Sequence, residues 1–313
     1  MSTITALPAR RAPDGFAILT MIALCAIWGL QQVAIKNTNT FLPPMFQAGL
    51  RSAIATLLVW GWARARGTPL FRDDGTLGAG LLAGVLFASE FVCIFLGLTL
   101  TSASRMAVFL YTAPCFTALG LHWFVDGERM RRMQWAGIIV AFAGIALAFA
   151  DGFTPTHGVT QGSMLAGLTG DALGVLGGVT WAATTVVVRA SRLAHSSASK
   201  TLFYQLAVSA VVLLALAAGF GQVKVAILTP IVLVSLAYQA VVVAFVSYLT
   251  WFWLLTRYIA SRLSVFSFLT PLFGVTFGVL LLGESFSGRF MLAALLVLAG
   301  IALVNAPARQ PVA

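Results

Sequence analysis

The stretch ASRLSVFSFLTP, at Ala260–Pro271, repeats an earlier stretch of the same chain. ASRMAVFLYTAP stands at Ala103–Pro114 and has the same residue in six of the twelve places. The two copies begin 157 residues apart in a chain of 313 residues, so each lies at the same point of its half. This spacing predicts two related halves, which we place at residues 1–152 and 153–313.

The composition is that of a membrane protein. Hydrophobic residues make up 60% of the chain and charged residues 9%, whereas soluble domains have about 45–50% and about 25%. Apolar runs of about 20 residues, the length that crosses a bilayer, recur along the sequence. We predict an all-α integral membrane protein with ten transmembrane helices, at about 16–35, 44–63, 77–98, 104–124, 133–150, 169–188, 201–220, 229–254, 263–282 and 289–306.

Further matches extend the repeat to five spans in each half. Trp28–Lys36 (WGLQQVAIK) corresponds to Trp181–Arg189 (WAATTVVVR), and AGIAL occurs at Ala143–Leu147 and again at Ala299–Leu303. Because five is an odd number, the second half must enter the membrane upside down relative to the first. Inverted repeats are typical of transporters that open a central site to either side in turn. Duplication for assembly alone, as in some channels, is the alternative.

The distribution of basic residues predicts the orientation. If the N-terminus is cytoplasmic, 14 of the 19 Lys and Arg residues fall on the cytoplasmic side and four outside, with Arg51 inside a span. Residues 151–168 contain no Lys or Arg, as expected of an external loop. The positive-inside rule therefore predicts cytoplasmic termini. The same placement explains the net charge of +10 by membrane orientation, so we expect no nucleic-acid partner.

The order of the motifs resembles one known family. AIWGLQQVAIK in the first span, an Arg in the second (FQAGLRSAIATLL), Pro114 and Pro271 in the fourth and ninth, and two copies of Gly-Glu before AGIAL-type helices are similar to the EamA family of the drug/metabolite transporter superfamily. This resemblance implies ten helices in two inverted five-helix repeats. Within the family the chain looks like the YddG-type aromatic amino-acid exporters.

The resemblance also implies a function and a location. It implies a multi-pass secondary transporter of a bacterial-type plasma (inner) membrane that exports small metabolites, above all aromatic or hydrophobic amino acids. Alternating access would run through a central cavity. We expect a small-molecule substrate, the lipid bilayer around the helices, no cofactor, no metal, and a monomer or weak homodimer. Val208 stands where the repeat would place a second Arg51, which argues against a shared binding role for that position.

Polar residues inside the spans are the first candidates for function, because burying them in lipid is costly. Glu90 lies thirteen residues into a span that starts near Leu77, which is about 20 Å along the helix and close to the midplane. It could meet a substrate ammonium, carry a proton, or form a structural hydrogen bond as a neutral acid. For Arg51 we favour snorkelling or bonds to loop carbonyls over binding a substrate carboxylate. Asp171 is expected to cap the sixth span.

Polar and aromatic residues at related places of the two halves are expected to line one cavity, although each alone is more often a helix-packing residue. The predicted substrate-binding residues are Gln31, Glu90, Tyr111, Trp181, Thr185, Tyr238 and Ser267. Pro114 and Pro271 each remove a backbone hydrogen bond within a span, and we expect them to act as hinges. The small residues Gly137 and Gly144 predict close packing of the fifth span, which we expect to be scaffold together with the tenth.

Other functions find less support in the sequence. No lysine follows a glycine, so a P-loop is absent, and neither HExxH nor GxSxG occurs. No filter-like loop or ring of charges indicates a channel. A membrane-embedded lipid transferase would need a charged cluster on a loop. Export of hydrophobic cationic drugs, with Glu90 as the counter-charge, remains the alternative among transporters.

The predicted orientation can be tested by labelling Thr160, which lies in the segment without basic residues. In a Thr160→Cys variant of a chain whose three native cysteines are replaced, a membrane-impermeant maleimide should react from outside the cell. Reaction only after the cytoplasmic side is exposed would reverse the topology.

Overall fold

The computed structural model describes residues 13–124, 130–152, 161–224, 229–258 and 265–305 and is built of helices. The first half contains α1 (Gly15–Thr38), α2 (Pro44–Ala65), α3 (Leu77–Leu100), α4 (Ala103–Leu110), α5 (Ala113–Phe124) and α6 (Arg132–Gly152). The second half contains α7 (Gln161–Ala190), the short 3₁₀ turn η1 (Arg192–His195), α8 (Ala198–Gly219), α9 (Pro230–Ala237), the π-helix η2 (Tyr238–Ser247), α10 (Tyr248–Arg257), the 3₁₀ turn η3 (Val265–Phe268), α12 (Leu269–Leu282) and α13 (Gly288–Asn305).

These elements form about ten spans, as the sequence predicts. Helices α4 and α5 together make the fourth span, α9, η2 and α10 the eighth, and η3 with α12 belongs to the ninth. Seven helical segments of the described residues are long and apolar enough to cross a membrane, and α12 and α13 are shorter apolar helices. Large apolar side chains such as Leu19, Val211 and Leu280 are at least 70% exposed. Such a surface suits lipid, and the fold class is confirmed.

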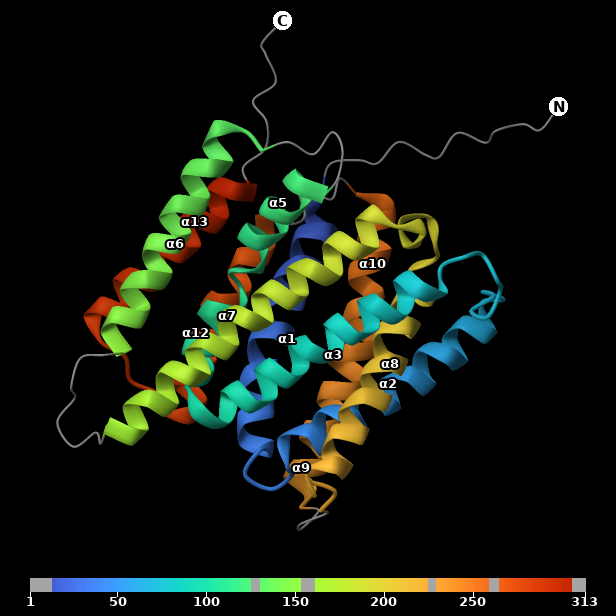
Figure 1. Ribbon diagram of the computed structural model, residues 1–313, viewed down its shortest axis with the longest axis horizontal. Helices are drawn as coiled ribbons and strands as arrows, with labels where there is room; N and C mark the ends of the chain where they lie inside the picture. The colour runs from blue at the N-terminus through green and yellow to red at the C-terminus, as the bar shows by residue number, and fades with distance from the viewer. Residues whose placement is uncertain (1–12, 125–129, 153–160, 225–228, 259–264, 306–313) are drawn as a thin grey trace, which may run out of the picture.

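The two halves are inverted relative to each other (Figure 1). Helix α1 runs from the upper side of the view to the lower side, whereas its equivalent α7 runs from lower left to upper right. The beginning of α1 and the end of α13 lie on the same, upper side. Since equivalent helices are antiparallel, the axis that relates the halves lies in the membrane plane, as in inverted-repeat transporters.

Ser52 and Ser209 join the two halves. Their hydroxyl oxygens are hydrogen-bonded at 3.3 Å where α2 packs against α8. Both side chains are fully buried. The second and seventh spans, α2 and α8, therefore contact each other through buried polar groups.

A second symmetric contact joins α6 and α13. A methyl group added at Gly137 would lie 2.7 Å from the carbonyl oxygen of Gly300, and one added at Gly144 would lie 2.8 Å from that of Ala293. The backbones of the two helices therefore pass in direct contact, which only small residues permit. Figure 1 shows this pair at the left of the molecule, beside the remaining helices. The expected packing of the fifth and tenth spans is confirmed.

The prolines lie differently from the prediction. The fourth span is interrupted at Tyr111 and Thr112, so Pro114 is the second residue of the new helix α5. Pro271 is the third residue of α12, directly after the 3₁₀ turn η3. A proline in the first turn of a helix loses no helical hydrogen bond, because the first N–H groups have no helical acceptor. The expectation that these prolines lie mid-helix is wrong; each one follows a break already present.

The close contact of α6 and α13 predicts an unequal effect of two identical substitutions. Gly300→Ala should lower the thermal midpoint of the purified protein, because the new methyl group would meet the backbone of Gly137 and Ala141; overpacking of this kind costs about 1–3 kcal/mol. Gly61→Ala in α2 is the control, since nothing lies within 4 Å of the added carbon. Equal midpoints for the two variants would show that the pair is loosely packed.

Candidate functional site

Arg51 is the most deeply buried charged residue of the candidate site. Helix α2 places its side chain in the interior, at 0% exposure. The guanidinium carbon lies 4.0 Å from the centroid of the Phe91 ring, and Nη2 donates to the Tyr248 hydroxyl at 3.3 Å. Nε and Nη1 are buried and have no hydrogen-bond partner among the residues that the structure describes. Arg51 thus points inward and keeps two free donors, and the expected snorkelling is wrong.

Glu90, on α3, supplies the opposite charge. Its side chain is buried, and Oε2 has no hydrogen-bond partner. The charges of Glu90 and Arg51 interact, although the two side chains form no direct ion pair. The role of Glu90 in binding a substrate ammonium stays a prediction.

Depth along the helices explains why the pairing was missed. Counted from Leu77, Glu90 lies near the midplane of the membrane. Counted from Pro44, Arg51 lies near the membrane surface. The two counts start at opposite membrane faces. Counted from Leu100 instead, Glu90 lies ten residues, about 15 Å, from the same face from which Arg51 lies seven residues, about 10 Å. Two long side chains on neighbouring helices can bridge such a difference. Counting both from one face would have revealed the pair.

Aromatic groups lie beside this pair, and α1 adds two buried amides to the interior of the described residues. Tyr111, at the break between α4 and α5, stands edge-on to Trp181 of α7 with ring centroids 5.3 Å apart. Tyr111 also lies close enough to Glu90 and Tyr248 to interact electrostatically. Gln31 and Gln32 of α1 are both buried, and Oε1 of Gln32 has no partner. The cluster therefore draws on both halves of the chain.

Other predicted residues make structural bonds. The Tyr238 hydroxyl donates to the carbonyl of Ile27 at 2.6 Å and ties η2 to α1. The Thr185 hydroxyl donates to the carbonyl of Trp181 within α7. Ser267 is half-buried in η3. A substrate role for Tyr238, Thr185 and Ser267 stays a prediction, and their hydroxyls are less available than the free atoms of Arg51 and Glu90.

The cluster breaks the symmetry of the repeat. The position 157 residues after Glu90 holds Ser247, which accepts a hydrogen bond of 2.9 Å from the Trp28 indole. Both buried charges of the cluster, Arg51 and Glu90, come from the first half. Phe91 and Tyr248 are equivalent positions, and both contact the Arg51 guanidinium. Arg51 is close enough to the axis to touch the same place in each half.

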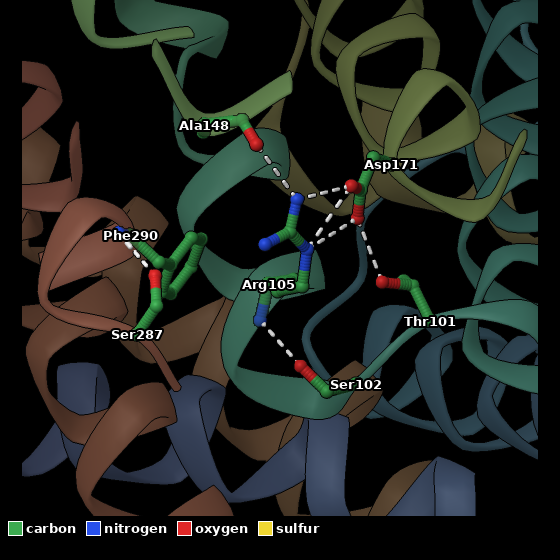
Figure 2. A network of polar contacts seen from close by, with 7 residues as sticks. All are labelled: Thr101, Ser102, Arg105, Ala148, Asp171, Ser287 and Phe290. Atoms are coloured by element: carbon green, nitrogen blue, oxygen red, sulfur yellow. Dashed lines mark hydrogen bonds and ion pairs between the residues drawn. The ribbon is translucent and has the colours of Figure 1, made fainter. Parts of the chain in front are cut away.

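A second polar network lies near the lower end of α3 in Figure 1 and is drawn in Figure 2. Arg105 of α4 forms an ion pair with Asp171 of α7, with Nε at 3.0 Å from both carboxylate oxygens. Asp171 also accepts from the Thr101 hydroxyl at 2.7 Å, and Nη2 of Arg105 donates to the carbonyl of Ala148 at 2.9 Å. Figure 2 shows the guanidinium between these groups. The network fastens α4 to α6 and α7.

The place of Asp171 corrects an expectation. Helix α7 begins at Gln161, well before the predicted start of the sixth span, so Asp171 lies ten residues inside the helix. It cannot cap the helix from there. Its carboxylate is 1% exposed and is balanced by Arg105 rather than by a helix N-terminus.

Glu284 fastens the same end from the other half. Its carboxylate oxygens accept from the backbone N–H groups of Ala103 and Ser104 at 2.7 and 2.9 Å, which caps the N-terminus of α4. Lys36, at the end of α1, lies 4.0 Å from Glu284 and donates to the carbonyl of Thr101. These bonds and the Arg105–Asp171 pair close one end of the bundle; we call them together the end network.

The opposite end has a related contact. The Tyr258 hydroxyl, 157 residues after Thr101, lies 3.1 and 2.9 Å from the two carboxylate oxygens of Asp14. Thr101 ends α3 and Tyr258 ends α10, so both hydroxyls follow the equivalent spans. On this side Lys200 also pairs with Asp74 at 2.8 Å and, together with Thr76, lowers the pKa of that carboxyl to about 2.

Comparison with known proteins gives one consistent result. The pattern of the EamA-like transporter family matches residues 15–150 and 168–306. The chain is similar to a protein of Salmonella typhimurium named a probable amino-acid metabolite efflux pump, with 26% identity over 92% of this chain and 93% of the relative. A protein of Escherichia coli strain K12 with the same name is 27% identical over 92% and 93%. One solved crystal structure has the same fold, with a TM-score of 0.64, 18% identity, and coverage of 94% and 96%.

The end network predicts that Asp171→Asn destabilises the protein. The amide keeps the shape of the side chain but removes the charge that balances Arg105, and a hydrogen bond to a charged group contributes about 2 kcal/mol. The thermal midpoint of the variant should fall below that of the parent. Asp73→Asn is the control, because Asp73 is exposed and its hydrogen bond to Gly75 is long, at 3.4 Å. A midpoint as high as the control's would contradict a stabilising role for the pair.

Proposed function

Because the chain belongs to the EamA-like transporter family, we propose that it exports amino acids and related small metabolites across the bacterial plasma membrane. Members of this family are membrane transporters rather than enzymes. The proposal concerns the substrate, the direction, the membrane and the mechanism. It places the substrate at the cluster of Arg51 and Glu90 between the two inverted halves.

The free buried atoms of that cluster carry the proposal. Nε and Nη1 of Arg51 and Oε2 of Glu90 are buried, and no described part of the chain gives them a hydrogen-bond partner. A buried polar atom without a partner costs about 1–3 kcal/mol, and more when it is charged. Inverted-repeat transporters bind their substrates at such a place, between the halves and inside the membrane. A polar substrate would satisfy these atoms and offset the cost of their burial.

Amino acids are the proposed class for two reasons. The two relatives named above are both amino-acid metabolite efflux pumps by name. The cluster also holds one cation and one anion beside the aromatic pair of Tyr111 and Trp181. The narrower resemblance to aromatic amino-acid exporters fits this pair, since rings favour edge-to-face contacts. We therefore propose hydrophobic and aromatic amino acids.

Alternating access would require the ends to open in turn. With cytoplasmic termini, the end network lies on the external side, and release of an exported substrate requires the Arg105–Asp171 pair to separate. The interruption at Tyr111 and Thr112 lies between this pair and α5. We propose that this break and the equivalent junction of η3 with α12 are where the fourth and ninth spans bend, with Pro114 and Pro271 preventing the breaks from closing.

Hydrophobic cationic drugs remain the alternative substrate. Glu90 could balance their charge, but the Arg51 cation lies near it and would repel them. Hence the arrangement favours substrates that carry a negative group as well. An enzyme activity finds no support in the family.

Transport by the purified protein in liposomes tests the proposal. Radiolabelled leucine or phenylalanine should be moved, and a lipophilic cation such as tetraphenylphosphonium should not. Glu90→Gln should reduce amino-acid transport about tenfold or more, the loss expected when a buried charge loses its partner, while the thermal midpoint stays close to the parent's. Asp73→Asn, a charge removal on the surface, should transport like the parent.

Movement of the cation and not of the amino acids would establish the alternative. If Glu90→Gln transported with parent kinetics from pH 5 to pH 8, Glu90 would be a structural group.

A further inference from the structure

We propose that Arg51 binds the carboxylate of the substrate while Glu90 binds its ammonium group, so that the protein selects zwitterions over molecules with a single charge. This inference rests on the proposed function, since it concerns the same buried cluster. It adds a residue and a rule of selectivity: both charged groups of the substrate are required.

The surroundings of Arg51 determine what it can still bind. One face of its guanidinium is covered by the Phe91 ring at 4.0 Å. Nη2 is engaged by the Tyr248 hydroxyl, which leaves Nε and Nη1. A guanidinium has only donors and keeps its charge in proteins. A group that satisfies both free nitrogens must therefore be an acceptor, and an anionic acceptor such as a carboxylate forms the stronger bonds.

Glu90 offers the complementary group. Its free Oε2 is an acceptor, and the side chain is held on α3 beside Phe91, the residue that also covers Arg51. A substrate ammonium has only hydrogen-bond donors, so it can bind the Glu90 carboxylate, which accepts. In the same way, the substrate carboxylate accepts hydrogen bonds from Arg51. Because Arg51 and Glu90 form no direct ion pair, each keeps binding capacity. An α-amino acid carries both partners on one carbon atom, its α-carbon.

The same two charges would exclude related molecules. An amine would satisfy Glu90 but leave Arg51 without a partner and close to a second cation. A carboxylic acid without an ammonium group would bind Arg51 but leave Glu90 without a partner and close to a second anion. A site that leaves a buried charge unpaired with the wrong ligand discriminates through repulsion and desolvation as well as through attraction. Neither single-charge class should compete with the amino acid.

Tyr248 has a positioning role in this account. Tyr248 comes from the second half, whereas Arg51 and Glu90 come from the first. Its hydroxyl accepts the one hydrogen bond that the Arg51 guanidinium donates to a described residue. The contact holds the free edge of Arg51 in place and links the site to η2 and α10. Removing the hydroxyl should weaken substrate binding without removing either charge.

A ligand series tests the rule in liposomes that contain the full-length protein. Labelled leucine is the transported substrate, and leucinamide, isoamylamine and 4-methyl-2-oxopentanoate are the unlabelled competitors. Leucine itself should compete, and each of the other three should need a concentration at least about tenfold higher for equal inhibition. Leucinamide is the sharpest probe, because it keeps the ammonium and the side chain but lacks the carboxylate.

Variants assign the carboxylate to Arg51. Arg51→Gln should lower leucine transport at least about tenfold and make leucine and leucinamide equal competitors for whatever transport remains. Arg51→Lys, which keeps the charge, should retain the preference for leucine, and Tyr248→Phe should raise the half-saturating leucine concentration with little change in the maximal rate. Arg64→Gln removes an exposed arginine of the same helix and should match the parent.

Separate results distinguish this inference from the proposed function. Equal competition by leucinamide and leucine in the parent, or an unchanged preference in Arg51→Gln, would overturn the inference while amino-acid transport stands. A parent protein that transports no amino acid would overturn both. Should Arg51→Gln fail to fold, the competition series in the parent and in Tyr248→Phe still decides, because neither needs the arginine to be removed.

Discussion

An odd number of spans in each half is the constraint on which this architecture depends. It forces equivalent helices to run in opposite directions and so puts the relating axis in the membrane plane. Helices α2 and α8 then meet at Ser52 and Ser209, and α6 meets α13 through glycines at equivalent places. Both contacts are between an element and its own equivalent. They leave the remaining helices arranged around a common centre.

The symmetry of the repeat is broken at the buried charges, where we propose that the substrate binds. The backbone fold repeats, but the second half has no charged residue in its sequence at the places that correspond to Arg51 and Glu90. One half therefore carries both charges. Arg51 lies close enough to the axis to touch equivalent residues, Phe91 and Tyr248, from both halves. A charge pair placed there is held by both halves, and any movement of one half against the other changes its surroundings.

Much of the fold could be predicted from the sequence, because lipid imposes simple rules. Length and hydropathy located the spans, charge bias and the odd span number indicated the inversion, and the small residues of the fifth span indicated its packing. The interruption at Tyr111, the π-helix from Tyr238 to Ser247 and the early start of α7 at Gln161 could not be predicted. These features depend on contacts with neighbouring helices, and no local sequence pattern predicts them.

The site was predicted less completely than the fold. Glu90, Tyr111 and Trp181 were predicted from polarity and position and stay predictions, whereas Arg51 was expected to snorkel or to bond loop carbonyls and Asp171 to cap a helix. Both errors have the same cause: the depth of a charged residue was judged on its own helix, without its neighbours. In the structure, a second helix brings the opposite charge within range of each, Glu90 for Arg51 and Arg105 for Asp171.

The most direct test of the account is an experimental structure of the protein with a bound amino acid. The account predicts the ligand between the halves, with its carboxylate within hydrogen-bond distance of Nε or Nη1 of Arg51 and its ammonium at Glu90. An amino acid bound elsewhere in the membrane region, with Arg51 and Glu90 in contact only with the protein, would contradict it.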